Sequence, residues 1–174
     1  MDTRTHILDT GEALMKRSGF SGFSYAAIAD AVGIRKASIH YHFPTKAHLA
    51  AAAVARYREA TAEALGDPTA LTAPADAVDR MGAVFEDAWN GPGTGCLCGS
   101  LAADWAALPE TVQAGVAAYW RDAVSWLEAA GVSPENARLV FALLEGAMLS
   151  ARVAGDGAIL KAATAAARGL LGTP

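Results

Sequence analysis

The sequence predicts an all-α fold of about nine helices, and three observations favour it. Alanine dominates the composition and β-branched residues are sparse, so the summed propensity favours helix almost everywhere after Thr3. Apolar residues recur at spacings of three and four, with no alternating strand pattern to compete. Glycine and proline divide these stripes into segments of helical length. At 174 residues, the chain is long enough to bury a core without disulfides or metals.

The first helix is expected from Thr3 to about Ser18, where Gly19 ends it. Residues 23–49 then predict two short helices joined by a tight turn. Ser24 suits the N-cap of the first and Gly33 the turn after it, while Pro44 ends the second near Phe43. Together these segments form a three-helix head whose core is expected to hold Phe20, Phe23, Ile28, Ile39 and Phe43.

Outside its apolar face, the second short helix is basic, hydroxyl-bearing or aromatic. This mixture suits contact with phosphates and with base edges, and the helix-turn-helix therefore predicts double-stranded DNA as a partner. Residues expected to contact DNA are Arg35, Lys36, Ser38, His40, Tyr41, His42 and Lys46.

The order of residues in this stretch resembles the TetR family of bacterial repressors. Matching positions hold Ile28, Ala29, Gly33, Ile34, Ser38, Ile39, His42, Phe43, Lys46 and Leu49. One position differs, because His40 stands where the family usually has tyrosine. The phosphate or base contact expected at this position would then come from a shorter ring with a titratable nitrogen. The resemblance implies a helix-turn-helix DNA-binding domain over residues 1–45. It also implies a six-helix effector-binding and dimerisation domain, the body, over residues 46–174.

The charge of the chain is unevenly distributed. Residues 1–50 carry six basic and four acidic side chains, whereas residues 51–174 carry eight basic and 14 acidic ones. The net charge of the whole chain is −4. A mildly basic head on an acidic body would present only the head to a phosphate backbone. A chance asymmetry remains the alternative.

Six further helices are expected after the head. Thr45 suits the N-cap of a long helix from Lys46 to about Leu65, whose N-terminus and Lys46 would suit a phosphate. Glycine and proline punctuation places the others at about 74–89, 94–108, 109–130, 134–153 and 158–171. The resemblance implies that helices at about 134–154 and 158–171 form a homodimer interface. A two-fold dimer would place its recognition helices about 34 Å apart on a pseudo-palindromic operator.

The sequence contains no convincing catalytic constellation, so we expect neither an enzyme nor a cofactor. The pairs His40/His42 and Cys96/Cys98 are too sparse for a metal site, because residues two apart point to different sides of a helix. With no signal peptide and no apolar run long enough to cross a membrane, we expect a cytoplasmic protein with reduced cysteines.

The resemblance implies a small-molecule effector pocket in the body. Residues expected there are Met81, Phe85, Trp89, Cys96, Trp105, Tyr119, Trp120, Phe141 and Glu145. The aromatic members have spacings that are ordinary for core residues, and the alternative is that most of them pack in the core and only a subset lines the pocket. For Glu145, a place in the dimer interface is the alternative.

The segment that begins Gly95-Cys96-Leu97 resembles one branch of TetR-like regulators, some of which sense electrophiles or oxidants through a cysteine at the position of Cys96. In the first turn of a helix, backbone N–H groups would favour a thiolate. Alternatively, Cys96 is a small buried hydrophobe. The expected function is thus a repressor released by a small-molecule effector, with covalent modification of Cys96 as the alternative switch.

Overall fold

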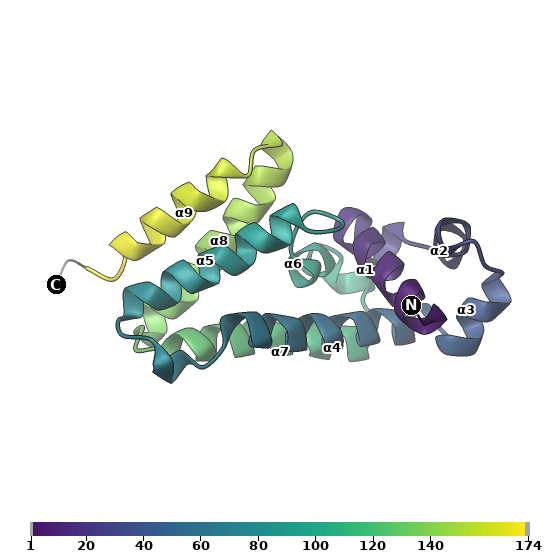
Figure 1. Ribbon diagram of the computed structural model, residues 1–174, viewed down its shortest axis with the longest axis horizontal. Coiled ribbons are helices and arrows are strands. Elements are labelled where there is room, and N and C mark those ends of the chain that lie inside the picture. The colour runs from purple at the N-terminus through teal and green to yellow at the C-terminus, as the bar shows by residue number, and fades with distance from the viewer. Residues whose placement is uncertain (1, 173–174) are drawn as a thin grey trace.

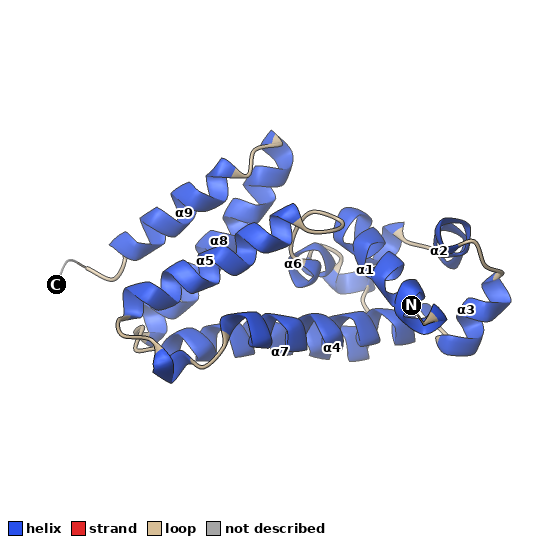
Figure 2. Ribbon diagram, in the orientation of Figure 1, coloured by secondary structure: helices blue, strands red, loops and turns tan. Residues whose placement is uncertain are grey.

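The structure is a computed structural model that describes residues 2–172, and over this range it contains nine α-helices, two short 3₁₀ turns and no strand (Figure 2). This confirms the predicted all-α fold. The helices are α1 Thr3–Gly22, α2 Tyr25–Val32, α3 Lys36–His42, α4 Lys46–Leu65, α5 Pro74–Asn90, α6 Leu97–Ala102, α7 Glu110–Ala129, α8 Pro134–Ala154 and α9 Ala158–Gly169. Figure 1 shows α2 and α3 at one end of an elongated molecule and α9 at the other. No helix of the described part is long and apolar enough to cross a membrane.

The helix-turn-helix forms through the local signals that predicted it. The Ser24 hydroxyl accepts from the Ala27 N–H at 3.2 Å, which caps α2. Gly33 ends α2 with a φ of 75°, a left-handed conformation that glycine adopts without steric cost. Ile39 and Phe43 are buried and fix α3 against the head core.

Helix α1 extends beyond the predicted end. Gly19 interrupts it with φ 67° and ψ −171°, but the chain resumes helical geometry up to Gly22. The Ser21 N–H donates to Asp104 Oδ2 at 2.8 Å, so a carboxylate from the body caps the resumed turn. The partner lies 83 residues away, which is why local sequence signals did not reveal it.

The helix predicted at 94–108 is shorter and divided. Thr94 and Gly95 have φ values of 49° and 126°, so α6 begins only at Leu97 with Cys96 as its N-cap. It ends at Ala102, and a separate 3₁₀ turn covers Trp105–Ala107.

Charged side chains join α1 to α4. Arg56 on α4 donates to Asp9 at 2.6 Å and to Glu12 at 2.7 Å. Lys16 is buried, lies 3.0 Å from the Glu12 carboxylate and places its ammonium 5.0 Å from the centroid of the Tyr57 ring. These contacts make the first helix of the head and the first helix of the body one mechanical unit.

Candidate nucleic-acid interface and effector cavity

Helix α3 presents most of its predicted DNA-contact residues at the surface. Arg35, Lys36, His40 and Tyr41 are exposed, with Tyr41 84% accessible, while Ser38 and His42 are half-buried. The buried side chain of Ile39 faces the opposite way, into the head core. The polar face of the helix is therefore free to enter a groove.

His40 is held at the end of α3. Its Nδ1 lies 3.2 Å from the Pro44 carbonyl oxygen, and its ring packs edge-on against Tyr25 with centroids 4.9 Å apart. The Tyr25 hydroxyl donates to the Phe43 carbonyl at 2.7 Å, and burial raises the pKa of Tyr25 to about 12. Since Nδ1 is engaged, any contact of this ring with another molecule would use Nε2.

The Lys46 side chain packs against aromatic rings of the head core and does not extend into solvent. Its ammonium sits 4.3 Å from the centroid of the Phe23 ring and 4.7 Å from that of Phe20. Burial lowers the pKa of Lys46, and the Asp104 carboxylate opposes this shift. Thr45 caps α4 as predicted, with its hydroxyl accepting from the His48 N–H at 3.3 Å.

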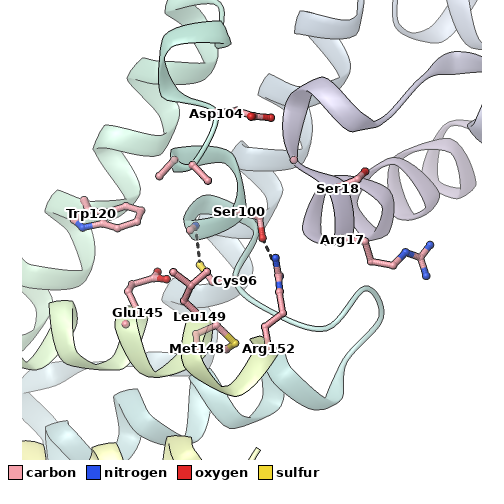
Figure 3. A pocket seen from close by; sticks show the side chains of 15 residues that line it. Arg17, Ser18, Cys96, Ser100, Asp104, Trp120, Glu145, Met148, Leu149 and Arg152 are labelled. Atoms are coloured by element: carbon pink, nitrogen blue, oxygen red, sulfur yellow. Dashed lines mark hydrogen bonds between the residues drawn. The ribbon is translucent and has the colours of Figure 1, made fainter. Parts of the chain in front are cut away.

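A cavity of about 510 Å³ lies between the head and the body (Figure 3). Its walls come from the C-terminal part of α1, from α6 and the loop after it, from α7 and from α8. Of the nine predicted pocket residues, three line it: Cys96, Trp120 and Glu145.

The other six predicted residues do not line this cavity. Met81, Phe85, Tyr119 and Phe141 are buried core residues, and the rings of Phe85 and Phe141 meet edge-on with centroids 5.9 Å apart. Trp89 packs beside Gly157 at the start of α9, and Trp105 is 46% exposed. Of the six aromatic residues predicted for the pocket, only Trp120 therefore lines this cavity.

Sequence reasoning missed the polar wall of the cavity. Arg17, Ser18 and Gly19 reach it from α1, together with Ser100 and Asp104 from the body. Another missed residue is Arg152 on α8, whose Nη2 donates to the Lys16 carbonyl at 2.8 Å, the Thr94 carbonyl at 3.0 Å and Ser100 Oγ at 3.0 Å. Three distant segments supply these residues, and no local motif marks them.

Cys96 is buried at the base of the cavity. Its thiol donates to the Tyr119 hydroxyl, with 3.6 Å between Sγ and oxygen, and accepts from the Gly99 N–H at 3.3 Å. Burial and then the Glu145 carboxylate raise the pKa of Cys96, although the Gly99 N–H favours the thiolate. Burial therefore favours the neutral thiol, because the loss of solvation outweighs the helix N-terminus. Burial likewise raises the pKa of Cys98.

Glu145 on α8 contributes a buried carboxyl group. Its Oε1 has no hydrogen-bond partner among the described residues. Burial raises the pKa of this carboxyl from 4.5 to about 7, and the neighbouring Cys96 thiol acts in the opposite direction. In Figure 3 the carboxyl points toward Cys96, on the side of the cavity where Trp120 lies.

The outer surface of α8 carries exposed large apolar side chains. On α8 these are Leu139, Leu143, Leu149 and Val153, with Leu149 62% and Val153 86% accessible, and Leu170 follows α9. A face of this kind is typical of a surface that another protein covers.

Comparison with known proteins places the chain in a family. Residues 7–53 match the family described as "Bacterial regulatory proteins, tetR family". A transcriptional regulator of the TetR family from Agrobacterium tumefaciens has the same fold with a TM-score of 0.88 and 32% identity, over 97% of this chain and 96% of that one. A TetR transcriptional regulator from Legionella pneumophila is 28% identical over 98% of both chains, with a TM-score of 0.86. The HTH-type transcriptional repressor NemR of Escherichia coli strain K12 is 25% identical over 99% of this chain and 96% of that protein. With its helix-turn-helix head and helical body, the chain belongs to the TetR family of bacterial transcriptional regulators.

Proposed function

We propose that this regulator is a repressor that binds a pseudo-palindromic operator as a homodimer and is released by a small molecule bound in the cavity. The HTH-type repressor NemR, similar over almost the whole chain, supports repression. Residues 1–45 would act as the DNA-binding domain and residues 46–174 as the effector-binding and dimerisation domain. The apolar face of α8 and α9 would form the dimer interface.

The observation that carries this proposal is that head and body both line the cavity. Arg17, Ser18 and Gly19 belong to α1, whereas the opposite wall comes from α6 and α8. A ligand between these walls would push α1 relative to α8. Since Arg56 ties α1 to α4, these two helices would move together and change the spacing of the two α3 helices.

DNA contact would come from Arg35, Lys36, Ser38, His40, Tyr41 and His42, with Lys46 at the start of α4. The proposed roles differ with position. Exposed Arg35 and Lys36 at the start of α3 suit phosphates or guanine edges, and the exposed ring of Tyr41 suits a base or sugar. The ammonium of Lys46 lies over the rings of Phe20 and Phe23, so it would contact only a phosphate that comes close to this edge of the head.

Fluorescence anisotropy with duplexes from the region upstream of the gene tests the DNA-binding part. We expect Lys36→Ala to weaken operator binding and to make the slope of log affinity against log salt shallower by about one. Arg121→Ala, which removes an exposed cation on the body, is the matched control and should leave both quantities unchanged. If no upstream duplex binds more tightly than random DNA, the proposed function is refuted.

Operator release tests the effector part. A compound that dissociates wild-type protein from its operator should have a weaker effect on Trp120→Ala, which alters the cavity wall, than on Trp105→Ala, which alters an exposed site outside it. Equal effects on both variants would place the effector elsewhere.

A second candidate function is a switch through covalent modification of Cys96. The observation in its favour is that Cys96 lines the cavity, so a bound electrophile would meet its sulfur. Treatment with N-ethylmaleimide should then release wild type and Cys98→Ser from the operator but not Cys96→Ser. If all three proteins respond alike, the switch does not use Cys96.

A further inference from the structure

Glu145, which lines the cavity, has one carboxyl oxygen that the described protein leaves without a partner. Glu145 Oε1 is fully buried and accepts no hydrogen bond from any described residue. Glu145 lines the cavity beside Cys96 and Trp120, and its other oxygen faces Gly99, where a Cβ would collide with it. A buried carboxyl oxygen without a donor is costly, and such a group usually has a ligand, water or ion as its partner.

No cation of the described chain neutralises this carboxylate. The salt bridges found in residues 2–172 do not include Glu145. Arg152, on the same helix, directs its Nη2 to the Lys16 and Thr94 carbonyls and to Ser100 Oγ. Figure 3 shows Arg17, at the far side of the cavity, extending away from it.

The rest of the wall near Glu145 is apolar or aromatic. Trp120, Met148 and Leu149 line the cavity together with the small residues Ala102 and Ala103. Aromatic faces attract cations and stack on flat apolar groups. The volume of about 510 Å³ is within the range of sites that hold drug-sized ligands.

We propose that the cavity selects ligands that carry a protonated nitrogen on an apolar or aromatic body, with Glu145 as the acceptor of the N⁺–H group. This proposal rests on the proposed effector site and names the chemical class of ligand that the site takes. The nitrogen would donate to the Glu145 carboxylate, and the body of the ligand would lie against Trp120, Met148 and Leu149.

Binding of three probes of the same size tests the proposal. The probes are 1-naphthylmethylamine, which is cationic, 1-naphthalenemethanol, which is neutral, and 1-naphthoic acid, which is anionic. Isothermal titration calorimetry on the full chain should give the amine roughly ten- to hundredfold tighter binding than the alcohol, since a hydrogen bond between charged groups is stronger than a neutral one. The acid should bind most weakly.

Variants identify the acceptor. Glu145→Gln keeps the shape of the side chain and should reduce binding of the amine to the level of the alcohol, while leaving the alcohol unchanged. Glu135→Gln, an exposed substitution on the same helix, should keep the preference of wild type for the amine. The proposal is overturned if wild type shows no preference for the amine, or if Glu145→Gln retains that preference.

The same samples separate this proposal from the proposed function. If the amine binds through Glu145 but does not weaken operator binding, the proposed ligand class is supported, and the proposal that a ligand in the cavity releases the operator is refuted. If other compounds release the operator while the amine shows no selective binding, the proposed release by a ligand is supported and the proposed ligand class is refuted. If Glu145→Gln changes the oligomeric state in sedimentation and the amine shows no preference, the carboxyl belongs to the dimer interface and the proposal is overturned.

Discussion

Replacing Glu145 by glutamine should stabilise the unliganded protein at alkaline pH. Burial raises the pKa of this carboxyl from 4.5 to about 7. Between these two pH values the folded protein therefore binds more protons at this site than the unfolded chain does. Stability falls as the pH rises through that window, because an ionised carboxylate must then remain buried. Glutamine keeps the shape of the side chain but carries no charge at any pH.

The magnitude follows from the two pKa values. The interval from 4.5 to about 7 corresponds to about 3 kcal/mol of destabilisation above neutral pH and to none below about pH 4.5. For a chain of this length, about 3 kcal/mol corresponds to a shift in melting temperature of roughly 6 to 12 °C. Other titratable groups facing this carboxyl are Cys96, Cys98, Tyr57 and Tyr119. Burial raises the pKa of each, so they remain neutral across the window.

Urea unfolding of wild type and Glu145→Gln, at one protein concentration and at several pH values from about 5 to about 8, measures the effect. The difference in unfolding free energy should grow with pH in favour of the variant. Glu135→Gln, on the exposed part of the same helix, should track wild type at every pH. A difference that does not change with pH would show that the carboxyl already has a partner in the folded protein, such as a group across a dimer interface, and would refute the reasoning.

Three other predictions follow from the geometry. Gly19→Ala should destabilise the protein by about 1 to 2 kcal/mol in calorimetry, because residue 19 has a φ of 67° and a Cβ there would lie 2.6 Å from the Asp104 carboxylate. Gly169→Ala, in open space, is its control and should cause no loss. Both cysteines are buried with raised pKa values, so Ellman's reagent should modify them at least about tenfold more slowly in native than in unfolded protein; equal rates would contradict the burial. Val153→Glu, on the exposed apolar face of α8, should produce monomers in sedimentation equilibrium if this face forms the dimer interface.

Local signals made most of the fold predictable. The N-caps Ser24, Thr45 and Ser133 each accept the backbone N–H that their position in the sequence implied. Gly33 likewise ends α2 in the left-handed conformation expected of the turn. Such signals depend on neighbours within a few residues, so a sequence displays them directly.

The cavity depends on contacts that no local pattern records. Asp104 caps the resumed turn of α1 from 83 residues away, and Arg152 joins α8 to both α1 and α6. Glu145 was recognisable as an acid on an apolar helix, but its unpaired oxygen was not. The helix N-terminus at Cys96 was also visible in the sequence, whereas the burial that reverses its effect on the thiol is a property of the complete fold.

The junction between head and body has a consequence for how such regulators diversify. Arg152 and Ser100 both donate to the main-chain carbonyl of Lys16, so this part of the junction depends on the path of α1 and not on the side chain at position 16. A head that reads another operator can replace this one and still receive these hydrogen bonds, provided that α1 keeps its main-chain path and the glycine at position 19. Under the proposed function, the DNA target and the ligand can then change separately, because these hydrogen bonds depend on the main chain of α1 and not on its side chains.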